Sequence, residues 1–311
     1  MTFGHVSVLL NETVGAVVHD KNGIYVDCTL GGGGHARAMG ERLSERGMIV
    51  GLDRDTDARS AATERLKGLD CEVKIISANF RDLKSALAAE GIESADGFVF
   101  DLGVSSYQLD TPERGFSYMN DGPLDMRMNR ESGLTAADVV NGYEEEELTR
   151  ILKAYGEERW AKRIAAFVSE ARKAHPIETT GELVGIIKKA IPADARREGP
   201  HPAKRTFQAL RIEVNDELGI LKESIEDAIG MLRPGGRIGV ITFHSLEDRI
   251  VKRIFKELST GCICPPEIPV CVCNHRASIR VTGKAIEPTA EEVGLNPRAR
   301  SAKLRTAEKI I

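Results

Sequence analysis

The sequence lacks the marks of a membrane-bound, exported or broadly basic protein. None of its apolar runs reaches the roughly 18 residues that a transmembrane helix needs. Near the start, polar residues such as Asn11, Glu12 and Asp20 interrupt the apolar ones, which is not typical of a signal peptide. The net charge of −4 excludes a polybasic nucleic-acid binder. We therefore expect a cytoplasmic protein without membrane contact, in which local basic patches hold any nucleic acid.

Cysteine is scarce along most of the chain. Cys28 and Cys71 stand alone and are typical of small buried residues. The other four lie within twelve residues, at Cys262, Cys264, Cys271 and Cys273. Because nothing indicates export, this cluster predicts a structural zinc site and not a disulfide framework. The repeated Cys-x-Cys spacing leaves redox chemistry or four unligated thiols open as alternatives.

What the sequence does contain is a glycine-rich turn between a strand and a helix. Ile24 to Val26 are β-branched or aromatic, as a buried strand requires. Gly31 to Gly34 then let the backbone turn sharply and approach a ligand without a Cβ in the way. A helix is predicted from His35 to Leu43. Together these pieces predict the first half of a nucleotide-binding βαβ unit.

Acidic residues end the predicted strands. Residues 48–52 form an apolar strand followed by Asp53, twenty residues beyond Gly33, where a carboxylate accepts hydrogen bonds from a ribose. Asp27 and Asp101 end the first and fourth predicted strands. Because the carboxyl ends of parallel strands meet at one edge of a sheet, we expect the three carboxylates to share a ligand site.

The remaining pattern predicts an α/β fold: a Rossmann-like parallel sheet with a helical insertion between strands four and five. Further strands are predicted at 71–77, 95–102 and 238–243, with a late antiparallel edge strand at 277–282. Helices are predicted through 134–195, at 246–258 and, as one long helix, at 211–232. The turn-rich segment 108–128 is predicted to be an ordered lid. The expected domains are 1–108, 109–205 and 206–311, the last ending in a basic tail.

Two other functions fit part of this pattern. The spacing Gly31-x-Gly33-x-x-Ala36 formally satisfies the dinucleotide fingerprint of a nicotinamide dehydrogenase. Against it, Asp27 precedes the turn and can meet a cationic group, and no second mononucleotide-binding half follows the fourth strand. The turn at 232–236 is typical of S-adenosylmethionine-dependent methyltransferases. A non-catalytic RNA-binding protein is the other alternative, and the complete set of carboxylates counts against a decayed pocket.

Long segments spread along the chain carry a more specific resemblance. They are 5–10 (HVSVLL), 27–35 (DCTLGGGGH), 51–55 (GLDRD), 101–110 (DLGVSSYQLD), 114–117 (RGFS), 122–128 (GPLDMRM), 209–215 (ALRIEVN), 241–248 (ITFHSLED) and 298–305 (RARSAKLR). With these segments the chain resembles, nearly end to end, the bacterial 16S ribosomal RNA cytosine-N4 methyltransferase family.

That resemblance implies a class I S-adenosylmethionine-dependent methyltransferase core that methylates the exocyclic N4 amine of cytosine 1402. It implies S-adenosylmethionine as cofactor and 16S rRNA, within the assembled 30S subunit, as partner; a homodimer is left open. The cofactor-binding residues that it implies are Gly33, Gly34, His35, Asp53, Phe80, Asp101 and Gln108. Among many amino-methyltransferases an acidic residue or Asn followed by Pro-Pro-aromatic positions the amine, and residues 101–104 depart from that pattern.

The cytosine amine is a poor nucleophile because its lone pair is delocalised into the ring. Its methylation therefore requires a group that orients the amine. Asp101 is the leading catalytic candidate, with cofactor binding alone as its other role; Asp125 and Asn215 are alternatives. The base must leave its stack to enter a pocket. Side chains of the predicted lid that can stack on it, or simply pack, are Phe116, Tyr118, Met126 and Met128.

Two basic clusters can supply an RNA footprint. The first comprises Arg196, Arg197, His201, Lys204, Arg205 and Arg211, and the second Arg298, Arg300, Lys303 and Arg305. Both lie outside the helices with regularly paired charges, which favours RNA contact over a merely solvated face.

Overall fold

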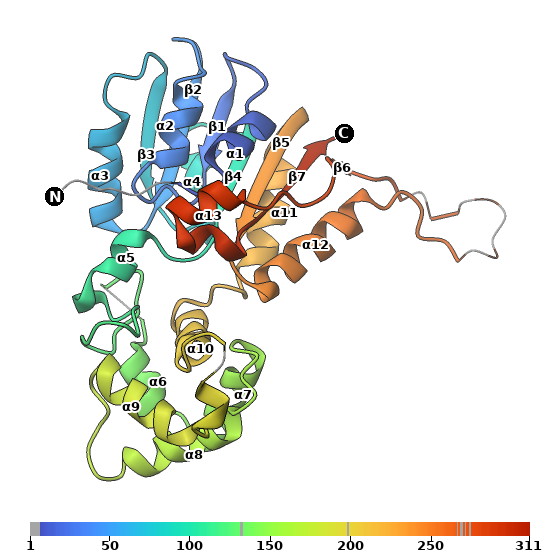
Figure 1. Ribbon diagram of the computed structural model, residues 1–311. Helices are drawn as coiled ribbons and strands as arrows, with labels where there is room; N and C mark the ends of the chain where they lie inside the picture. The colour runs from blue at the N-terminus through green and yellow to red at the C-terminus, as the bar shows by residue number, and fades with distance from the viewer. Residues whose placement is uncertain are drawn as a thin grey trace. The chain divides into compact units, whose positions relative to one another are not determined.

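The computed structural model describes residues 7–130, 133–197, 199–265, 267, 270, 272–273 and 275–311. The chain divides into two compact units (Figure 1). The first combines Met1–Gly103 with Ile220–Ile311, and the second is Val104–Gly219. In chain order the second unit is therefore an insertion between the fourth and fifth strands of the first.

The first unit is built on a seven-stranded sheet in the order β3-β2-β1-β4-β5-β7-β6. Its strands are β1 (Ile24–Asp27), β2 (Met48–Asp53), β3 (Glu72–Ser77), β4 (Ala95–Asp101), β5 (Leu232–Thr242), β6 (Ile279–Val281) and β7 (Lys303–Lys309). The strands β1 to β5 are parallel to one another. β7 is antiparallel to both of its neighbours, β5 and β6. This order confirms the predicted Rossmann-like sheet.

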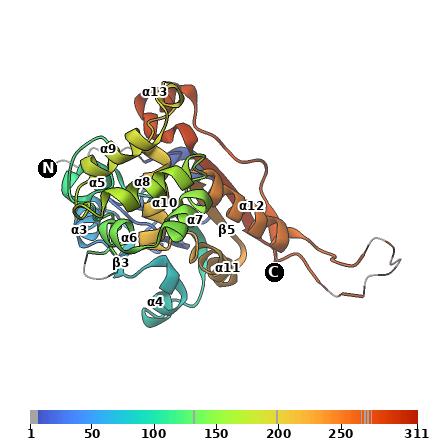
Figure 2. The same cartoon turned by 90° about the horizontal axis from the view of Figure 1, so that it is seen from below.

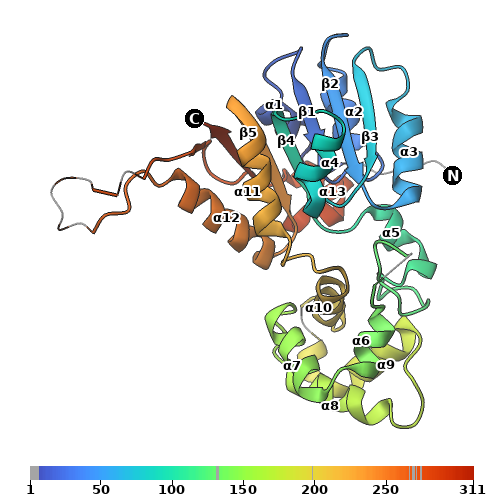
Figure 3. The same ribbon diagram turned by 180° about the vertical axis from the view of Figure 1, so that it is seen from behind.

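Helices cover both faces of this sheet, which is why its central strands are mostly buried (Figures 1 and 3). β4, for example, is buried at six of its seven positions. One face carries α1 (Leu10–Val17), α2 (Gly34–Gly40) and α3 (Thr56–Leu66). The other carries α4 (Leu83–Ala89), α11 (Leu221–Met231) and α12 (Ser245–Ser259). The short η1 (Phe80–Asp82), α13 (Ala290–Leu295) and η4 (Pro297–Ser301) complete the unit.

The end of the chain corrects the predicted basic tail. Residues 303–309 form β7, which pairs with β5 so that Leu304 lies opposite Ile241 and Ala307 opposite Ile238. All four of these side chains are fully buried. The predicted antiparallel edge strand is confirmed as β6, and it pairs with β7. The sheet therefore has two strands beyond β5 where the sequence predicted one.

The second unit is helical. Its elements are α5 (Ser106–Asp110), η2 (Pro112–Arg114), α6 (Ala136–Gly142), α7 (Glu145–Ala154), α8 (Ala161–Ala171), α9 (Thr180–Ala190), η3 (Asp194–Arg196) and α10 (Lys204–Asn215). The apolar stripes of these helices form one core of their own. The capping box predicted from Thr179 and Glu182 is present at the start of α9.

The long helix predicted at 211–232 is wrong. The helix α10 ends at Asn215, because Asp216 adopts a left-handed conformation with φ +50°, and α11 begins only at Leu221. The break falls where the chain passes from the second unit back to the first.

Within the described ranges, no helix combines the length and the apolar character needed to cross a membrane.

Candidate functional site

The glycine turn after β1 is too closely packed to accept side chains. Gly33 precedes α2 with φ +76°, and a Cβ there would lie 3.2 Å from the Cβ of Ala62 on α3. A Cβ on Gly34 would clash with the side chain of Ser7. Gly31 is also left-handed, with φ +49°. The bare backbone of this turn is what a ligand would meet at the carboxyl end of β1.

Asp53 ties this turn to β2. Its Oδ2 accepts a hydrogen bond from the backbone N–H of Gly31 at 2.8 Å, and its Oδ1 accepts one from the N–H of Asp55 at 2.8 Å. Each carboxylate oxygen has a second lone pair, so both can still accept a hydroxyl. Burial raises the pKa of Asp53, although the two backbone hydrogen bonds work in the opposite direction.

Asp27 lies at the end of β1 and is 1% exposed. The N–H of Thr29 donates to its Oδ1 at 3.1 Å. Burial is the main cause that raises the pKa of Asp27 to about 7. The nearby charge of Asp53 also raises it, whereas the hydrogen bond from Thr29 lowers it. The site thus contains a carboxyl group that changes charge near neutral pH.

Asp101, at the end of β4, has a carboxylate oxygen that can still accept a hydrogen bond. Its backbone N–H donates to the Thr29 hydroxyl at 2.6 Å, and its Oδ2 lies 3.5 Å from Nδ1 of His35. Its Oδ1 is buried without a hydrogen-bond partner among the described residues. Burial raises the pKa of Asp101 well above its usual value, and the charges of Asp27 and Glu247 raise it further. We expect a buried carboxyl group of this kind to bind a cationic or hydrogen-donating ligand.

His35 is the second residue of α2 and is 3% exposed. Its Nε2 lies 3.1 Å from the carbonyl oxygen of Val8, while its Nδ1 faces Asp101. The sequence predicted His35 as a site residue only through the family resemblance. The structure adds that the imidazole connects the segment before α1 to the end of β4.

The two other predicted cofactor residues lie in different units. Phe80 begins η1 in the first unit, where its ring makes an edge contact with Phe100 at a centroid distance of 5.9 Å. Gln108 belongs to the second unit, in α5. It forms a capping box with Ser105: its Oε1 accepts the N–H of Ser105 at 3.0 Å, and its own N–H donates to the Ser105 hydroxyl at 3.2 Å.

Two residues that the sequence analysis missed support the acidic site. Thr29 links Asp27 to Asp101 through its N–H and its hydroxyl. Glu247, 2% exposed on α12, accepts the N–H groups of Phe243 at 2.8 Å and His244 at 3.2 Å. The sequence signal for Glu247 is a capping box, in which an N-cap residue is followed three positions later by Glu. It was missed because the N-cap residue here is His244, and histidine is not among the usual N-cap residues.

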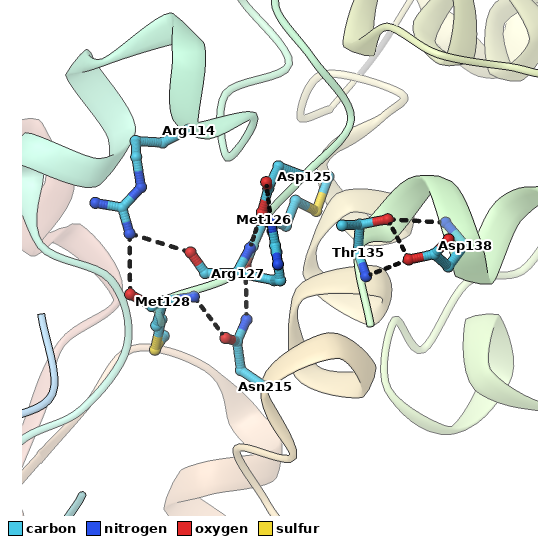
Figure 4. Close-up of polar contacts among 8 residues, drawn as sticks. All are labelled: Arg114, Asp125, Met126, Arg127, Met128, Thr135, Asp138 and Asn215. Atoms are coloured by element: carbon cyan, nitrogen blue, oxygen red, sulfur yellow. Dashed lines mark hydrogen bonds and ion pairs between the residues drawn. The ribbon is translucent and has the colours of Figure 1, made fainter. Parts of the chain in front are cut away.

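Asp125 and Asn215, the alternative catalytic candidates, hold the backbone of the second unit together (Figure 4). Asp125 forms a two-point ion pair with Arg127, at 3.0 and 2.8 Å. Burial alone would raise its pKa, but the hydrogen bonds from Arg127 outweigh this and lower it. Asn215 donates to the carbonyl of Met126 at 2.8 Å and accepts the N–H of Met128 at 2.8 Å. These bonds favour a structural role for both residues.

The predicted lid is ordered by packing within the second unit. Phe116 is 5% exposed and Met126 fully buried in its core, and Met128 packs against that core. Tyr118 stacks on His201 with ring centroids 4.7 Å apart. Packing thus accounts for all four side chains that were predicted either to stack on a base or to pack.

The basic clusters are only partly available for RNA. In the first, Arg211 forms a two-point ion pair with Glu217, and Arg205 donates to the carbonyl of Glu157. The exposed cations there are Arg196, Arg197, Lys204 and Arg205. In the second, Lys303 and Arg305 belong to β7, and Arg305 pairs with Asp248 at 2.6 and 3.1 Å. The predicted basic tail is therefore a strand at Lys303 and Arg305, while Arg298 and Arg300 of the same cluster are exposed.

Three of the four clustered cysteines are described. The Sγ atoms of Cys262, Cys264 and Cys273 lie within 4.8 Å of one another, after α12 and before β6. Cys271, predicted as the fourth ligand, lies outside the described residues.

Comparisons with known proteins cover the whole chain. The family model described as "MraW methylase family" matches residues 2–310. A protein of Clostridioides difficile named "Ribosomal RNA small subunit methyltransferase H" is 55% identical over 311 residues, covering 100% of both chains. A Clostridium botulinum protein of the same name is 57% identical with the same coverage. Among solved structures, an rRNA methylase from Streptococcus thermophilus aligns over 96% of this chain and 92% of its own, with 12% identity and a TM-score of 0.40, too weak a likeness to carry an argument.

Proposed function

The chain belongs to the MraW methylase family, and from that premise we propose that it transfers a methyl group from S-adenosylmethionine to the N4 amine of cytosine 1402 in 16S rRNA. The observation that carries the proposal is the full-length match to relatives named as methyltransferases of small-subunit ribosomal RNA. The carboxylates of Asp27, Asp53 and Asp101 at adjacent strand ends supply a site that suits this cofactor.

The residues of the first unit fit S-adenosylmethionine, which carries a sulfonium, an ammonium and a ribose. Buried carboxyl groups with raised pKa values favour a cationic ligand. The Oδ1 of Asp101, which has no hydrogen-bond partner among the described residues, gives such a ligand a contact. Asp53 has lone pairs left for the ribose hydroxyls. Gly33 and Gly34 allow close approach of the backbone, and Phe80 offers a ring face to a purine. The family resemblance adds Gln108 to the proposed cofactor-binding residues.

When bound, the cofactor supplies an electrophilic methyl group. The cytosine amine must be held in line with that group and must lose a proton when it is alkylated. We assign both tasks to Asp101, because burial raises its pKa and so makes its carboxylate a stronger proton acceptor than that of an exposed aspartate. Positioning of this kind can supply about 7–11 kcal/mol of a barrier in favourable cases. Thr29 holds the Asp101 backbone and His35 faces its side chain.

Within this proposal the substrate is the rRNA of an assembled 30S subunit in the cytoplasm. The target cytosine has to leave its stack to reach the site. The exposed cations Arg196, Arg197, Lys204 and Arg205 of the second unit are the proposed contacts to RNA phosphates. A structural zinc ion at the clustered cysteines is a second proposed ligand, separate from the methyl transfer.

The alternative functions differ in the ligand that they require. Calorimetry on the purified protein should detect binding of S-adenosylmethionine and none of NAD. Binding of NAD alone would contradict the proposal in favour of a dehydrogenase. A protein that binds ribosomal RNA but neither ligand would be a non-catalytic RNA-binding protein.

A further inference from the structure

We propose that Cys262, Cys264 and Cys273 are ligands of one structural zinc ion that fastens the hairpin between α12 and β6. Three thiol sulfurs within 4.8 Å of one another, in a chain with six cysteines overall, form the only all-sulfur cluster among the described residues. Soft thiolates select zinc over the hard cations that oxygen ligands bind. The site is separate from the proposed methyl transfer and does not depend on it.

The sulfur spacing matches tetrahedral zinc. The Sγ atoms of Cys262 and Cys273 are 3.9 Å apart. A disulfide would place them at about 2.05 Å. In a tetrahedral site with Zn–S bonds of about 2.3 Å, neighbouring sulfurs are separated by about 1.63 bond lengths, which is about 3.8 Å. The observed distance therefore excludes a disulfide and fits two ligands of one metal ion.

The two legs of the hairpin run together up to this cluster. At its base, the N–H of Ser278 donates to the carbonyl of Leu258 at 2.9 Å. Further out, Nδ1 of His275 lies 3.1 Å from the carbonyl oxygen of Gly261. At the cluster itself, a backbone N–H donates to the sulfur of Cys264 at 3.4 Å. An N–H group that donates to sulfur can hold a cysteine ligand in the orientation that the metal requires.

The described large apolar side chains of this hairpin are not packed against the rest of the unit. It extends away from the sheet beyond α12 (Figures 1 and 2). Its large apolar side chains are exposed: Ile263 by 61%, Val270 by 70% and Val272 by 68%. A segment that buries so little apolar surface needs a cross-link to keep one conformation. Zinc coordination supplies that cross-link where thiols stay reduced.

The test uses the full chain, purified under reducing conditions without chelator. We expect about one zinc per chain by metal analysis. Replacing Cys264 by Ser should lower zinc affinity at least tenfold, measured by competition with a chromophoric chelator, and Cys262→Ser and Cys273→Ser should do the same. The matched control is Cys71→Ser, which removes a buried thiol outside the cluster and should leave zinc content unchanged. Thermal unfolding of each variant identifies any that fails to fold.

Three results would overturn the proposal. One is a protein that takes up no zinc at micromolar concentrations of the ion. Another is full zinc content in a folded Cys264→Ser variant. The third is a Cys262–Cys273 disulfide that forms under the same reducing conditions. Because zinc content is measured without substrate, loss of methyl transfer in a zinc-replete protein would contradict the proposed function and leave this site intact.

Discussion

Nδ1 of His35 lies 3.5 Å from Oδ2 of Asp101, while Nε2 of the same ring lies 3.1 Å from the carbonyl oxygen of Val8. A carbonyl only accepts hydrogen bonds, so the ring must carry its proton on Nε2. The contact between Nδ1 and Oδ2 then requires one more proton, on the ring or on the carboxyl group. Burial raises the pKa of Asp101 and so favours retention of that proton in the free protein. With that proton, the pair carries no net charge.

Asp27 makes the stability of the free protein depend on pH. Its pKa is about 7 in the folded chain and about 3.9 in an unfolded one. Between these values the folded state holds a proton that the unfolded state has released, so this contribution to stability falls as pH rises from about 4 to about 7. The slope from one such group is at most about 1.4 kcal/mol per pH unit. Urea unfolding of Asp27→Asn across this range should show a flatter profile than the parent chain. Identical profiles would contradict the assignment.

Asp53 should contribute strongly to cofactor affinity. Asp53→Ala removes acceptors for the ribose hydroxyls, and charge-assisted hydrogen bonds are worth about 1.5–3 kcal/mol. Calorimetry should therefore show an affinity for S-adenosylmethionine that is about tenfold to a hundredfold lower. Asp57→Ala, which removes an exposed carboxylate in the first turn of α3, is the control and should bind normally. An unchanged dissociation constant for Asp53→Ala would mean that the ribose lies elsewhere.

The exposed cations of the second unit should govern RNA binding. Replacing Arg196, Arg197 and Lys204 by Gln removes the charges that we expect to neutralise RNA phosphates. The slope of log affinity against log salt should become shallower by about 0.7 for each phosphate that is no longer neutralised, while cofactor affinity stays the same. The control removes three exposed cations from α12: Lys252, Arg253 and Lys256. A salt slope that changes equally in both variants would argue against a specific patch.

Arg305 should act on stability and not on RNA affinity. Its two-point ion pair with Asp248 is about four-fifths buried on each side. Removing one partner leaves the other charge without its hydrogen bonds, so Arg305→Ala should lower the free energy of unfolding by about 1–3 kcal/mol. Lys303→Ala removes a more exposed pair with Glu287 and should cost about 0–1 kcal/mol. A stable Arg305→Ala variant with weakened RNA binding would restore the interpretation of a basic tail.

Much of the sheet could be predicted because local patterns determined it. The strands β1, β2 and β4 are apolar runs that end in Asp27, Asp53 and Asp101, and each run is visible without knowledge of its neighbours. β7 could not be predicted in the same way. Its lysines and arginine suggested a solvated segment, and Arg305 finds its partner 57 residues away along the chain.

The candidate site also combines residues that the local sequence predicts with contacts that it does not. Residues at strand ends could be placed from the sequence, since the carboxyl edge of a parallel sheet collects them. The supporting contacts could not be placed in this way. The Thr29 hydroxyl accepts the backbone N–H of Asp101, 72 residues away, and Glu247 forms a capping box with His244, an unusual N-cap residue, at the start of α12. The helix break at Asp216 was missed because its left-handed backbone has no strong local signal.

The decisive measurement for the proposed function is methyl transfer to ribosomal RNA. The purified chain would be incubated with labelled S-adenosylmethionine and unmethylated small ribosomal subunits, and the modified nucleotide would be mapped. We expect one labelled methyl group on N4 of cytosine 1402, with the rate reduced about a hundredfold or more in Asp101→Asn. Label at another nucleotide or on a ring carbon, or an undiminished rate in Asp101→Asn, would contradict this expectation.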